Sequence, residues 1–448
     1  MKITDITVVV LAGGDSTRLW PLQDKATISF LSKPLIYHTL YQLKQNGYKK
    51  VIIIASKLNF DLLKSIRTDF PEIDINILLQ TDLRGMGGAI LTCESYIKQQ
   101  PILVIGSSDV FEDILFADFS KMLKEQPQGI IAGITVNEYF PGGYLTVVGS
   151  DVKRIVEKPN KQSGNSSIVS LIFDYFSDGS RLLESVKNVK TNKDDLYETG
   201  IQTMLSKGYG IKFLPYKGYW GHLKYAWDIL SLNSYYLGKI HRYINASTQI
   251  SKTAVISGNV FIEEGVQVME YAKIVGPTYI GKGTIIGNHT MIRESMIGSN
   301  CMVGFSSEIT RSHIGDHCWF HKNYVGDSII ADNVSMGAGA TLANFRLDEG
   351  SIRSMVNGEK IDTGKTKLGA VIGKNVRLGV NVSIMPGIKV GNSTFISSGL
   401  VLGLDVPDGK FCTADAVSYK IFNNHILHNS TSKDNSGESM RFEKLKLK

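Results

Sequence analysis

The chain has 448 residues and a net charge of +7, with 43% hydrophobic and 20% charged residues, a composition typical of a globular protein with two or three domains. No apolar run reaches the roughly 18 residues of a membrane-spanning helix, so we expect no membrane partner. The basic residues are dispersed except at a C-terminal KLKLK, and nucleic acid or small phosphorylated substrates would explain the positive charge equally well. The charge alone does not decide between them, and we expect small-molecule substrates and no nucleic-acid partner.

The four cysteines are far apart and form no CxxC pair: Cys93, Cys301, Cys318 and Cys412. Their spacing argues against a zinc site and against the disulfide framework of a small secreted protein. The first residues, MKITDITVVV, lead directly into an apolar strand pattern and lack a signal-peptide cleavage region. We therefore expect a cytoplasmic protein.

Residues 1–240 alternate short apolar runs with helical patterns, which predicts an α/β domain. The expected strands are residues 7–12, 50–56, 75–80 and 102–109, and the expected helices are residues 33–47, 60–70 and 87–100. Strand–helix–strand units at this spacing need right-handed crossovers and give a Rossmann-like, mainly parallel sheet. Ligands of such sheets bind beyond the carboxyl ends of the strands, which here read LAGG, LLQ and GSSD.

Residues 11–25, LAGGDSTRLWPLQDK, place Gly13 and Gly14 directly after the first strand. Backbone amides of such a loop can approach a phosphate closely because no Cβ intervenes, and Arg18 adds a planar set of donors. A glycine loop by itself fits an ordinary tight turn equally well, so the longer pattern is needed to decide.

The longer pattern resembles that of sugar-phosphate nucleotidyltransferases over about residues 6–240. Their signature LAGGxGTRLxPL, then a lysine and GKP, is here LAGGDSTRLWPL, Lys25 and SKP. The resemblance implies attack of a sugar 1-phosphate on the α-phosphate of UTP or dTTP, with Arg18 and Lys25 neutralising phosphate charge and Asp109 holding Mg²⁺. The other nucleotide and sugar-phosphate contacts that it implies are Gly13, Gly14, Gln80, Gly85, Glu157 and Lys158.

The chain departs from this family pattern at several positions. The third glycine of the signature is Ser16, the glycine before Asp109 is Ser108, and a glycine usual in the sugar pocket is Leu171. In GYWGHLKYAWDIL (218–230), His222 replaces the second magnesium carboxylate and Lys224 replaces a glycine. Imidazole is a poor partner for magnesium, so we expect weak or absent nucleotidyl transfer.

The second half has a different period, because apolar residues recur mostly every six positions. They stand at 250, 256, 262, 268, 274, 280, 286, 292, 297, 303, 309, 314, 320, 330, 336, 342, 372, 378, 384, 390, 396 and 402. This spacing predicts a parallel β-helix of hexapeptide repeats over residues 250–415, with one apolar side chain per face filling the axis. Residues 343–371 interrupt the repeat and are expected to form a loop, and residues 416–448 a polar tail.

HKNYVGD (321–327) and GAGATLAN (337–344) lie just before this interruption. With Asn333 and KTKLGAVIG (365–373), they resemble the acetyltransferase half of bifunctional N-acetylglucosamine-1-phosphate uridyltransferases, including the archaeal type. That family's pattern is H-x-x-Y-x-G-D, then N-x-G-A-G-T-x-x-x-N, then a basic loop before I-I-G. The match covers about residues 250–410 and implies a left-handed β-helix, a homotrimer, and acetyl-CoA in the groove between neighbouring subunits.

These residue types fit transfer of an acetyl group from acetyl-CoA to the amine of a hexosamine 1-phosphate, with glucosamine 1-phosphate as the first candidate. The amine is largely an ammonium at neutral pH and needs a base, for which His321 is the natural choice, and Asn344 would meet the developing oxyanion. Tyr324, Arg353 and Lys367 would contact the sugar phosphate or its hydroxyls. The small residues that would let coenzyme A pass close to the backbone are Gly337, Ala338, Gly339 and Ala340.

Two alternatives stay open. The chain could act only as a nucleotidyltransferase, with the β-helix serving oligomerisation, although the His321–Tyr324–Asn344 set argues against this. It could also be a non-catalytic regulatory subunit that binds sugar nucleotide in its first half, which the replaced carboxylate at His222 favours. The sequence leaves the hexosamine and the nucleotide undecided.

Overall fold

The computed structural model describes residues 2–82, 84–159, 167–415 and 418–423. It divides into two compact units, the first made of Met1–Leu19 and Gln23–Asp228 and the second of Trp20–Leu22 and Ile229–Lys448. Within the described residues, no helix is long and apolar enough to cross a membrane.

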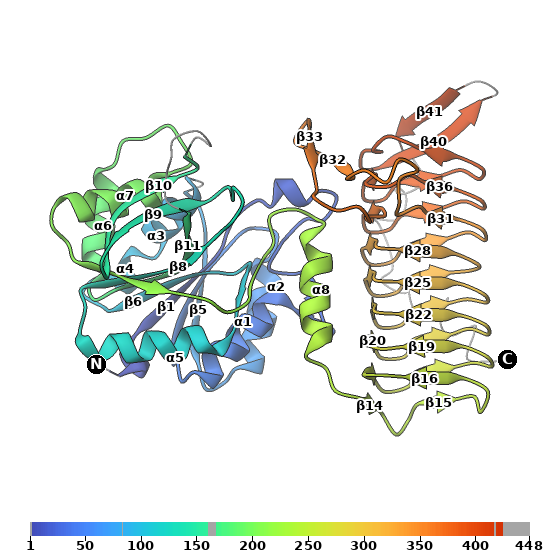
Figure 1. Cartoon of the computed structure of the whole chain (residues 1–448), viewed down its shortest axis with the longest axis horizontal. Coiled ribbons are helices and arrows are strands. Elements are labelled where there is room, and N and C mark those ends of the chain that lie inside the picture. The colour runs from blue at the N-terminus through green and yellow to red at the C-terminus, as the bar shows by residue number, and fades with distance from the viewer. Residues whose placement is uncertain (1, 83, 160–166, 416–417, 424–448) are drawn as a thin grey trace. The chain divides into compact units, whose positions relative to one another are not determined.

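The first unit is built on one nine-stranded sheet with the order β5-β4-β1-β6-β11-β8-β12-β10-β9 (Figure 1). Its strands are β1 (Thr7–Ala12), β4 (Lys50–Ala55), β5 (Asp74–Leu79), β6 (Ile102–Gly106), β8 (Gly129–Thr135), β9 (Gly143–Val148), β10 (Asp151–Glu157), β11 (Ile168–Phe176) and β12 (Ile211–Pro215). Two small pairs accompany it: β2 (Ser29–Phe30) with β3 (Lys33–Pro34), and β7 (Asp109–Phe111) with β13 (Trp220–His222).

The helices of this unit follow the strands as the alternating pattern predicts. They are α1 (Leu35–Gln45), α2 (Phe60–Ile66), α3 (Gly85–Thr92), α4 (Glu94–Ile97), α5 (Asp113–Met122), α6 (Gly179–Asn188) and α7 (Leu196–Ser206). The four expected strands are confirmed, whereas the helix expected over residues 87–100 is two helices, separated at the buried Cys93. Two apolar clusters cover the sheet, one around Val8, Val10 and Phe173 and the other around Val9, Ile54 and Val104.

The sheet is parallel where the sequence pattern is strongest and mixed elsewhere. Strands β5, β4, β1 and β6 are parallel neighbours, and β8 pairs parallel with β12. Strand β11 lies antiparallel between β6 and β8 and joins these two parts. The parallel edge aligns the carboxyl ends of β1 and β6, where ligands of such sheets bind.

The second unit is a β-helix of three parallel sheets, consistent with the left-handed form that the resemblance implies (Figure 1). The first sheet contains β14 (Tyr243–Ile244), β17 (Val260–Ile262), β20 (Thr278–Ile280), β23 (Met296–Ile297), β26 (His313–Ile314), β29 (Ile329–Ile330), β34 (Val371–Ile372) and β37 (Lys389–Val390). The second contains β15 (Gln249–Ile250), β18 (Gln267–Val268), β21 (Ile285–Ile286), β24 (Met302–Val303), β27 (Trp319–Phe320), β30 (Ser335–Met336), β35 (Arg377–Leu378), β38 (Phe395–Ile396), β40 (Lys410–Asp415) and the antiparallel β41 (Ser418–Asn423). The third contains β16 (Val255–Ser257), β19 (Lys273–Val275), β22 (Met291–Arg293), β25 (Glu308–Thr310), β28 (Tyr324–Gly326), β31 (Thr341–Leu342), β36 (Ser383–Ile384) and β39 (Val401–Leu402).

The predicted hexad positions fill the axis of this β-helix. Those from Ile262 to Leu402 belong to one buried cluster, while Ile250, at the first coil, is 37% exposed. The cluster also contains Val325, five residues after Phe320 and five before Ile330, so the repeat continues without a gap there. Asparagines such as Asn300 and Asn375 occupy corners of the β-helix with a left-handed backbone, a conformation that asparagine tolerates.

The interruption at residues 343–371 is not a plain loop as expected, because it carries the antiparallel hairpin of β32 (Arg353–Val356) and β33 (Glu359–Asp362). The chain leaves and rejoins the β-helix at one place: Leu368 N–H donates to the Asn344 carbonyl at 3.0 Å. Of the expected tail, β41 is a strand, and residues 416–417 and 424–448 lie outside the described residues.

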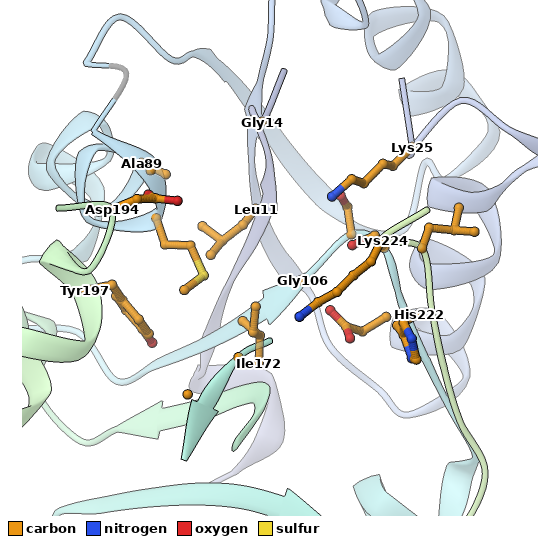
Figure 2. A pocket seen from close by; sticks show the side chains of 18 of the residues that line it. Leu11, Gly14, Lys25, Ala89, Gly106, Ile172, Asp194, Tyr197, His222 and Lys224 are labelled. Carbon is orange, nitrogen blue, oxygen red and sulfur yellow. The ribbon is translucent and has the colours of Figure 1, made fainter. Parts of the chain in front are cut away.

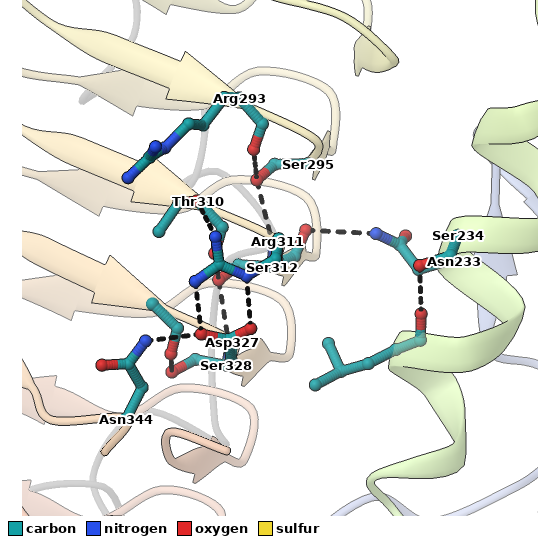
Figure 3. Close-up of polar contacts among 12 residues, drawn as sticks. Asn233, Ser234, Arg293, Ser295, Thr310, Arg311, Ser312, Asp327, Ser328 and Asn344 are labelled. Atoms are coloured by element: carbon teal, nitrogen blue, oxygen red, sulfur yellow. Dashed lines mark hydrogen bonds and ion pairs between the residues drawn. The ribbon is translucent and has the colours of Figure 1, made fainter. Parts of the chain in front are cut away.

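Helix α8 (Asp228–Gly238) begins at the division between the units, and its residues from Ile229 onwards belong to the second. Asn233 on this helix joins it to the β-helix, since its amide nitrogen donates to the Ser312 carbonyl at 3.4 Å (Figure 3). Its amide oxygen lies 3.2 Å from His313 Nδ1. The domain limits expected at residues 240 and 250 stay predictions.

Candidate functional site

The first unit contains a cavity of about 420 Å³ beyond the carboxyl ends of β1 and β6 (Figure 2). Every residue predicted for the nucleotide and metal sites lines it: Gly13, Gly14, Arg18, Lys25, Gln80, Gly85, Asp109, Glu157 and Lys158. The sheet topology accounts for this, because parallel neighbours bring their carboxyl ends to one edge. The structure thus assembles these side chains in one place.

The loop after β1 owes its shape to close packing. A Cβ on Gly13 would collide with the Gln80 amide, whose nitrogen donates to the carbonyls of Asp82 at 2.7 Å and Gly85 at 3.0 Å. Ser16, at the third glycine position of the signature, has φ +51°, a conformation that glycine adopts without strain. Its hydroxyl accepts from the Lys25 backbone at 3.3 Å and so ties the loop to the lysine.

Asp109 is surrounded by donors and cations. Its Oδ1 accepts from the Trp220 indole at 2.8 Å, and His222 lies directly opposite it in the β7–β13 pair. Burial raises the pKa of Asp109, while Trp220, His222, Lys224 and Lys25 oppose this effect. Burial lowers the pKa of His222, and among the described residues its Nδ1 is a buried atom with no hydrogen-bond partner.

Lys224 lines the same cavity, and Figure 2 shows its side chain and that of Lys25 reaching into it. Its Nζ donates to the Pro141 carbonyl and lies 3.5 Å from the centre of the Phe140 ring. Burial lowers the pKa of Lys224 to about 7, with Asp109 as the strongest opposing charge. Burial likewise lowers the pKa of Lys25.

The donors around Asp109 do not fit Mg²⁺, which needs near-octahedral oxygen ligands. One carboxylate oxygen already accepts from an indole, and two lysines face the group. No cluster of three or more His, Cys, Asp or Glu side chains suited to a metal exists in the part of the chain that the structure describes. Asp228 does not replace the missing carboxylate, because it accepts from the backbone nitrogens of Lys224 and Tyr225, both at 2.8 Å.

The other end of the cavity is acidic. Burial raises the pKa of Asp174 to about 8, although Tyr197 donates its hydroxyl to Asp174 Oδ2 at 2.9 Å. Burial and the nearby Glu157 raise the pKa of Glu198 to about 8. The position assigned to the sugar pocket at Leu171 is wrong by one residue: Leu171 is in the core, and Ile172 lines the cavity because side chains alternate along β11.

In the second unit, Tyr324 and Asn344 come together over Gly326. The Tyr324 hydroxyl donates to Asn344 Oδ1 at 3.3 Å, and burial raises the pKa of Tyr324. Strand β28 carries Tyr324 and pairs with β31, which brings the two motifs onto adjacent coils. A Cβ on Gly326 would lie 2.6 Å from Asn344 Nδ2 and 2.7 Å from the Tyr324 oxygen, so this contact requires glycine.

Asn344 is hydrogen-bonded to the ion pair of Asp327 and Arg311, which was not predicted from the sequence (Figure 3). Its amide nitrogen donates to Asp327 Oδ2, while Asp327 receives two bonds from Arg311, at 2.7 Å from Nε and 2.8 Å from Nη2. Arg311 lies one coil before Asp327 at the same corner, and this coil-to-coil register is the signal that could have identified it. The predicted Asn333, by contrast, is a corner residue whose amide donates to Asn375 at 2.8 Å.

His321 is exposed in the turn before β28. Its backbone N–H donates to Asn323 Oδ1 at 2.7 Å, and the Asn323 amide donates to the carbonyls of Gly337 at 2.8 Å and Ala340 at 3.0 Å. The His321 turn therefore stacks directly on the Gly337–Ala340 turn. Within that turn Ala338 and Gly339 are exposed, whereas the Ala340 methyl group is in the axis core.

The two predicted basic residues lie on the hairpin excursion. Arg353 is exposed at the start of β32, opposite Asp362. Lys367 is exposed where the excursion returns, and its backbone pairs with Phe345, next to Asn344. The excursion thus presents basic side chains on the segment that begins and ends at the Tyr324–Asn344 coil.

Comparisons with known proteins give matches to both halves of the chain. A family model described as nucleotidyl transferase matches residues 7–238, and one described as the EIF2B subunit epsilon LbH domain matches residues 257–352. The bifunctional sugar-1-phosphate nucleotidylyltransferase/acetyltransferase of Sulfurisphaera tokodaii is 31% identical over 90% of this chain and 98% of its own. Proteins named bifunctional protein GlmU from Methanococcus maripaludis and Methanocaldococcus jannaschii are each 30% identical, over 90% of this chain and 96% of theirs. The chain therefore belongs to the family of bifunctional sugar-1-phosphate nucleotidylyltransferases/acetyltransferases.

Proposed function

We propose that the β-helix unit transfers the acetyl group of acetyl-CoA to the amine of a hexosamine 1-phosphate, with glucosamine 1-phosphate as the first candidate. The observation that carries this proposal is the Tyr324–Asn344 contact at 3.3 Å, formed by two motif residues on adjacent coils beside the His321 turn. The product would serve the synthesis of a UDP-N-acetylhexosamine.

In this reaction the amine nitrogen attacks the thioester carbonyl, the carbon–sulfur bond breaks, and coenzyme A leaves as a thiol. His321 takes the proton that the amine must lose, since its exposed imidazole can act as a general base. The oxygen of the thioester becomes negative in the transition state, and the Asn344 amide would stabilise it as a fixed donor. Asp327 and Arg311 keep that amide in place.

The sugar phosphate would bind beside the hairpin excursion, where Arg353 and Lys367 are exposed and Tyr324 offers its hydroxyl. Coenzyme A would pass the Gly337–Ala340 turn, where only Ala338 adds an exposed side-chain atom. Both substrates would meet in the groove between neighbouring β-helices of a homotrimer. A second subunit would then complete the site.

Nucleotidyl transfer from UTP or dTTP in the first unit is the second activity that the family membership suggests. We expect it to be weak, because the charge environment of Asp109 is unfavourable for the metal on which such chemistry commonly depends. The exclusive nucleotidyltransferase and the non-catalytic sugar-nucleotide-binding subunit are the two competing functions, and the assay below separates all three.

The test is a substrate panel with the full-length protein. Release of the coenzyme A thiol is measured with glucosamine 1-phosphate, galactosamine 1-phosphate and unphosphorylated glucosamine, and pyrophosphate release is measured separately with UTP or dTTP plus N-acetylglucosamine 1-phosphate. We expect thiol release that depends on a hexosamine 1-phosphate, and slow pyrophosphate release. Pyrophosphate release without any sugar-dependent thiol release would assign the chain to the nucleotidyltransferase alternative, and neither product would favour the regulatory subunit.

A further inference from the structure

The cavity of the first unit contains a restrained lysine, Lys224, near the residue that the family pattern gives as the metal ligand. Lys224 lines the cavity. Among the charged groups around it, Asp109, the predicted metal ligand, does most to stabilise its protonated form. The side chain is held at two points, by the Pro141 carbonyl and by the face of Phe140 at 3.5 Å. Its backbone is fixed as well, because the nitrogen donates to Asp228 at 2.8 Å.

The aromatic neighbours make this position rigid. Phe140 packs edge-on against Trp220 and His222, with ring centres 4.6 and 4.9 Å apart. Trp220 in turn donates to Asp109 at 2.8 Å, so the lysine, the aromatic group and the carboxylate form one connected arrangement. A side chain restrained in this way loses little conformational entropy when it binds a ligand.

The rest of the cavity supplies what a phosphate chain needs. Arg18 and Lys25 line it together with Lys224, and Gly13 and Gly14 line it without side chains after β1. Cations in a partly buried site attract phosphate more strongly than they would in water, since the effective dielectric constant is lower. Beside Asp109, a divalent ion would have to compete with these two ammonium groups.

We propose that the first unit binds the phosphates of a nucleoside triphosphate without a divalent metal, with Lys224 and Lys25 as the built-in cations. This inference concerns the cavity of the first unit and does not depend on acetyl transfer in the second. It also accounts for the weak nucleotidyl transfer expected there, because Lys224 binds phosphate but does not reproduce the coordination geometry of Mg²⁺.

The test is calorimetric titration of the full-length protein with UTP, once in excess EDTA and once in excess MgCl₂. We expect dissociation constants that agree within about threefold, since the site's own cations already neutralise the phosphates. In EDTA, Lys224→Met should weaken UTP binding by about tenfold or more, because it removes the positive charge that pairs with the phosphates. Lys224→Arg should largely retain UTP binding, because it keeps this charge on a group of different shape. Lys153→Met changes an exposed lysine paired with Asp151, outside the cavity, and should leave binding unchanged.

The replacement can also be reversed. In the double variant His222→Asp/Lys224→Gly, the carboxylate and the space of the family pattern return, and UTP should bind about tenfold more tightly in MgCl₂ than in EDTA. Binding of UTP by the unmodified protein only in MgCl₂, or no binding in either condition, would overturn the proposal. Equal affinity of the unmodified protein and Lys224→Met in EDTA would overturn it too, and the chelator comparison needs no variant to fold.

Discussion

Replacing Asp327 by asparagine tests whether the Arg311 pair positions the amide of Asn344. The aspartate accepts two bonds from Arg311, at 2.7 and 2.8 Å, and one from the Asn344 amide. An asparagine keeps one acceptor oxygen and turns the other position into a donor, which must then face a donor of Arg311 or Asn344. Asp327→Asn therefore leaves at least one of these donors without its acceptor.

The structure sets the size of the effect. A hydrogen bond to a charged group contributes about 1.5–3 kcal/mol, and we expect a loss of about 2 kcal/mol because water reaches the Arg311 side chain, which is 33% exposed. The displaced Asn344 amide should lower kcat for acetyl transfer by about 10- to 100-fold with little change in KM, since a misplaced oxyanion donor acts mainly on the transition state.

Thiol-release kinetics and denaturant unfolding of the same preparations measure both effects. Glu264→Gln is the matched control, because it also removes a β-helix ion pair, to Lys282, but an exposed one far along the chain from the site. It should change neither kcat nor stability appreciably. If Asp327→Asn lost stability but kept its kcat, the argument that this pair positions Asn344 for catalysis would be refuted.

Three further predictions follow from burial and close packing. The raised pKa of Asp174, about 8, means that the folded state binds this proton more tightly than the unfolded state does. The stability that the bound proton contributes is therefore present at low pH and is lost between about pH 4 and 8, and Asp174→Asn should remove this loss. Equal slopes of unfolding free energy against pH for the two proteins would contradict the prediction. Gly326→Ala should abolish most acetyl transfer while leaving the melting temperature within a few degrees, because its methyl group displaces the ends of two side chains; full activity would show that their contact is dispensable. Ile330→Ala should lower the free energy of unfolding, measured with denaturant, by about 2–5 kcal/mol, because Ile330 is buried in the axis. Ile250→Ala should lower it much less, since Ile250 is 37% exposed. Similar losses of stability in the two variants would contradict the hexad register.

The β-helix could be predicted from the sequence because each coil repeats one simple constraint. Every sixth residue must be apolar to fill the axis, and Ile262 through Ile292 satisfy this in a row. Val325 was not predicted as an axis residue because the steps before and after it are five residues long. A fixed six-residue period does not include such shortened corners. The hairpin of β32 and β33 was missed for a related reason: its residues pair with each other and share no repeat with the coils.

The candidate sites show the same division between local pattern and three-dimensional contact. Tyr324 and Asn344 were predicted because short motifs carry them, whereas Arg311 belongs to no motif and reaches Asp327 only because coils stack. Leu171 was assigned to the cavity in place of Ile172 because a one-residue error in a strand exchanges its two faces. Lys224 was recognised as a replaced glycine, but its position against Phe140 required the structure.

The most direct test of acetyl transfer uses His321→Ala with glucosamine 1-phosphate and isotopically labelled acetyl-CoA, followed by detection of the labelled N-acetyl product. His317→Asn is the matched control, since His317 is an exposed histidine at the left-handed corner just before β27, and asparagine tolerates that conformation. We expect the unmodified protein and His317→Asn to form the product at similar rates, and His321→Ala to be slower by about 100-fold or more at neutral pH. Equal product formation by His321→Ala and the unmodified protein would contradict the assignment of this imidazole as the base.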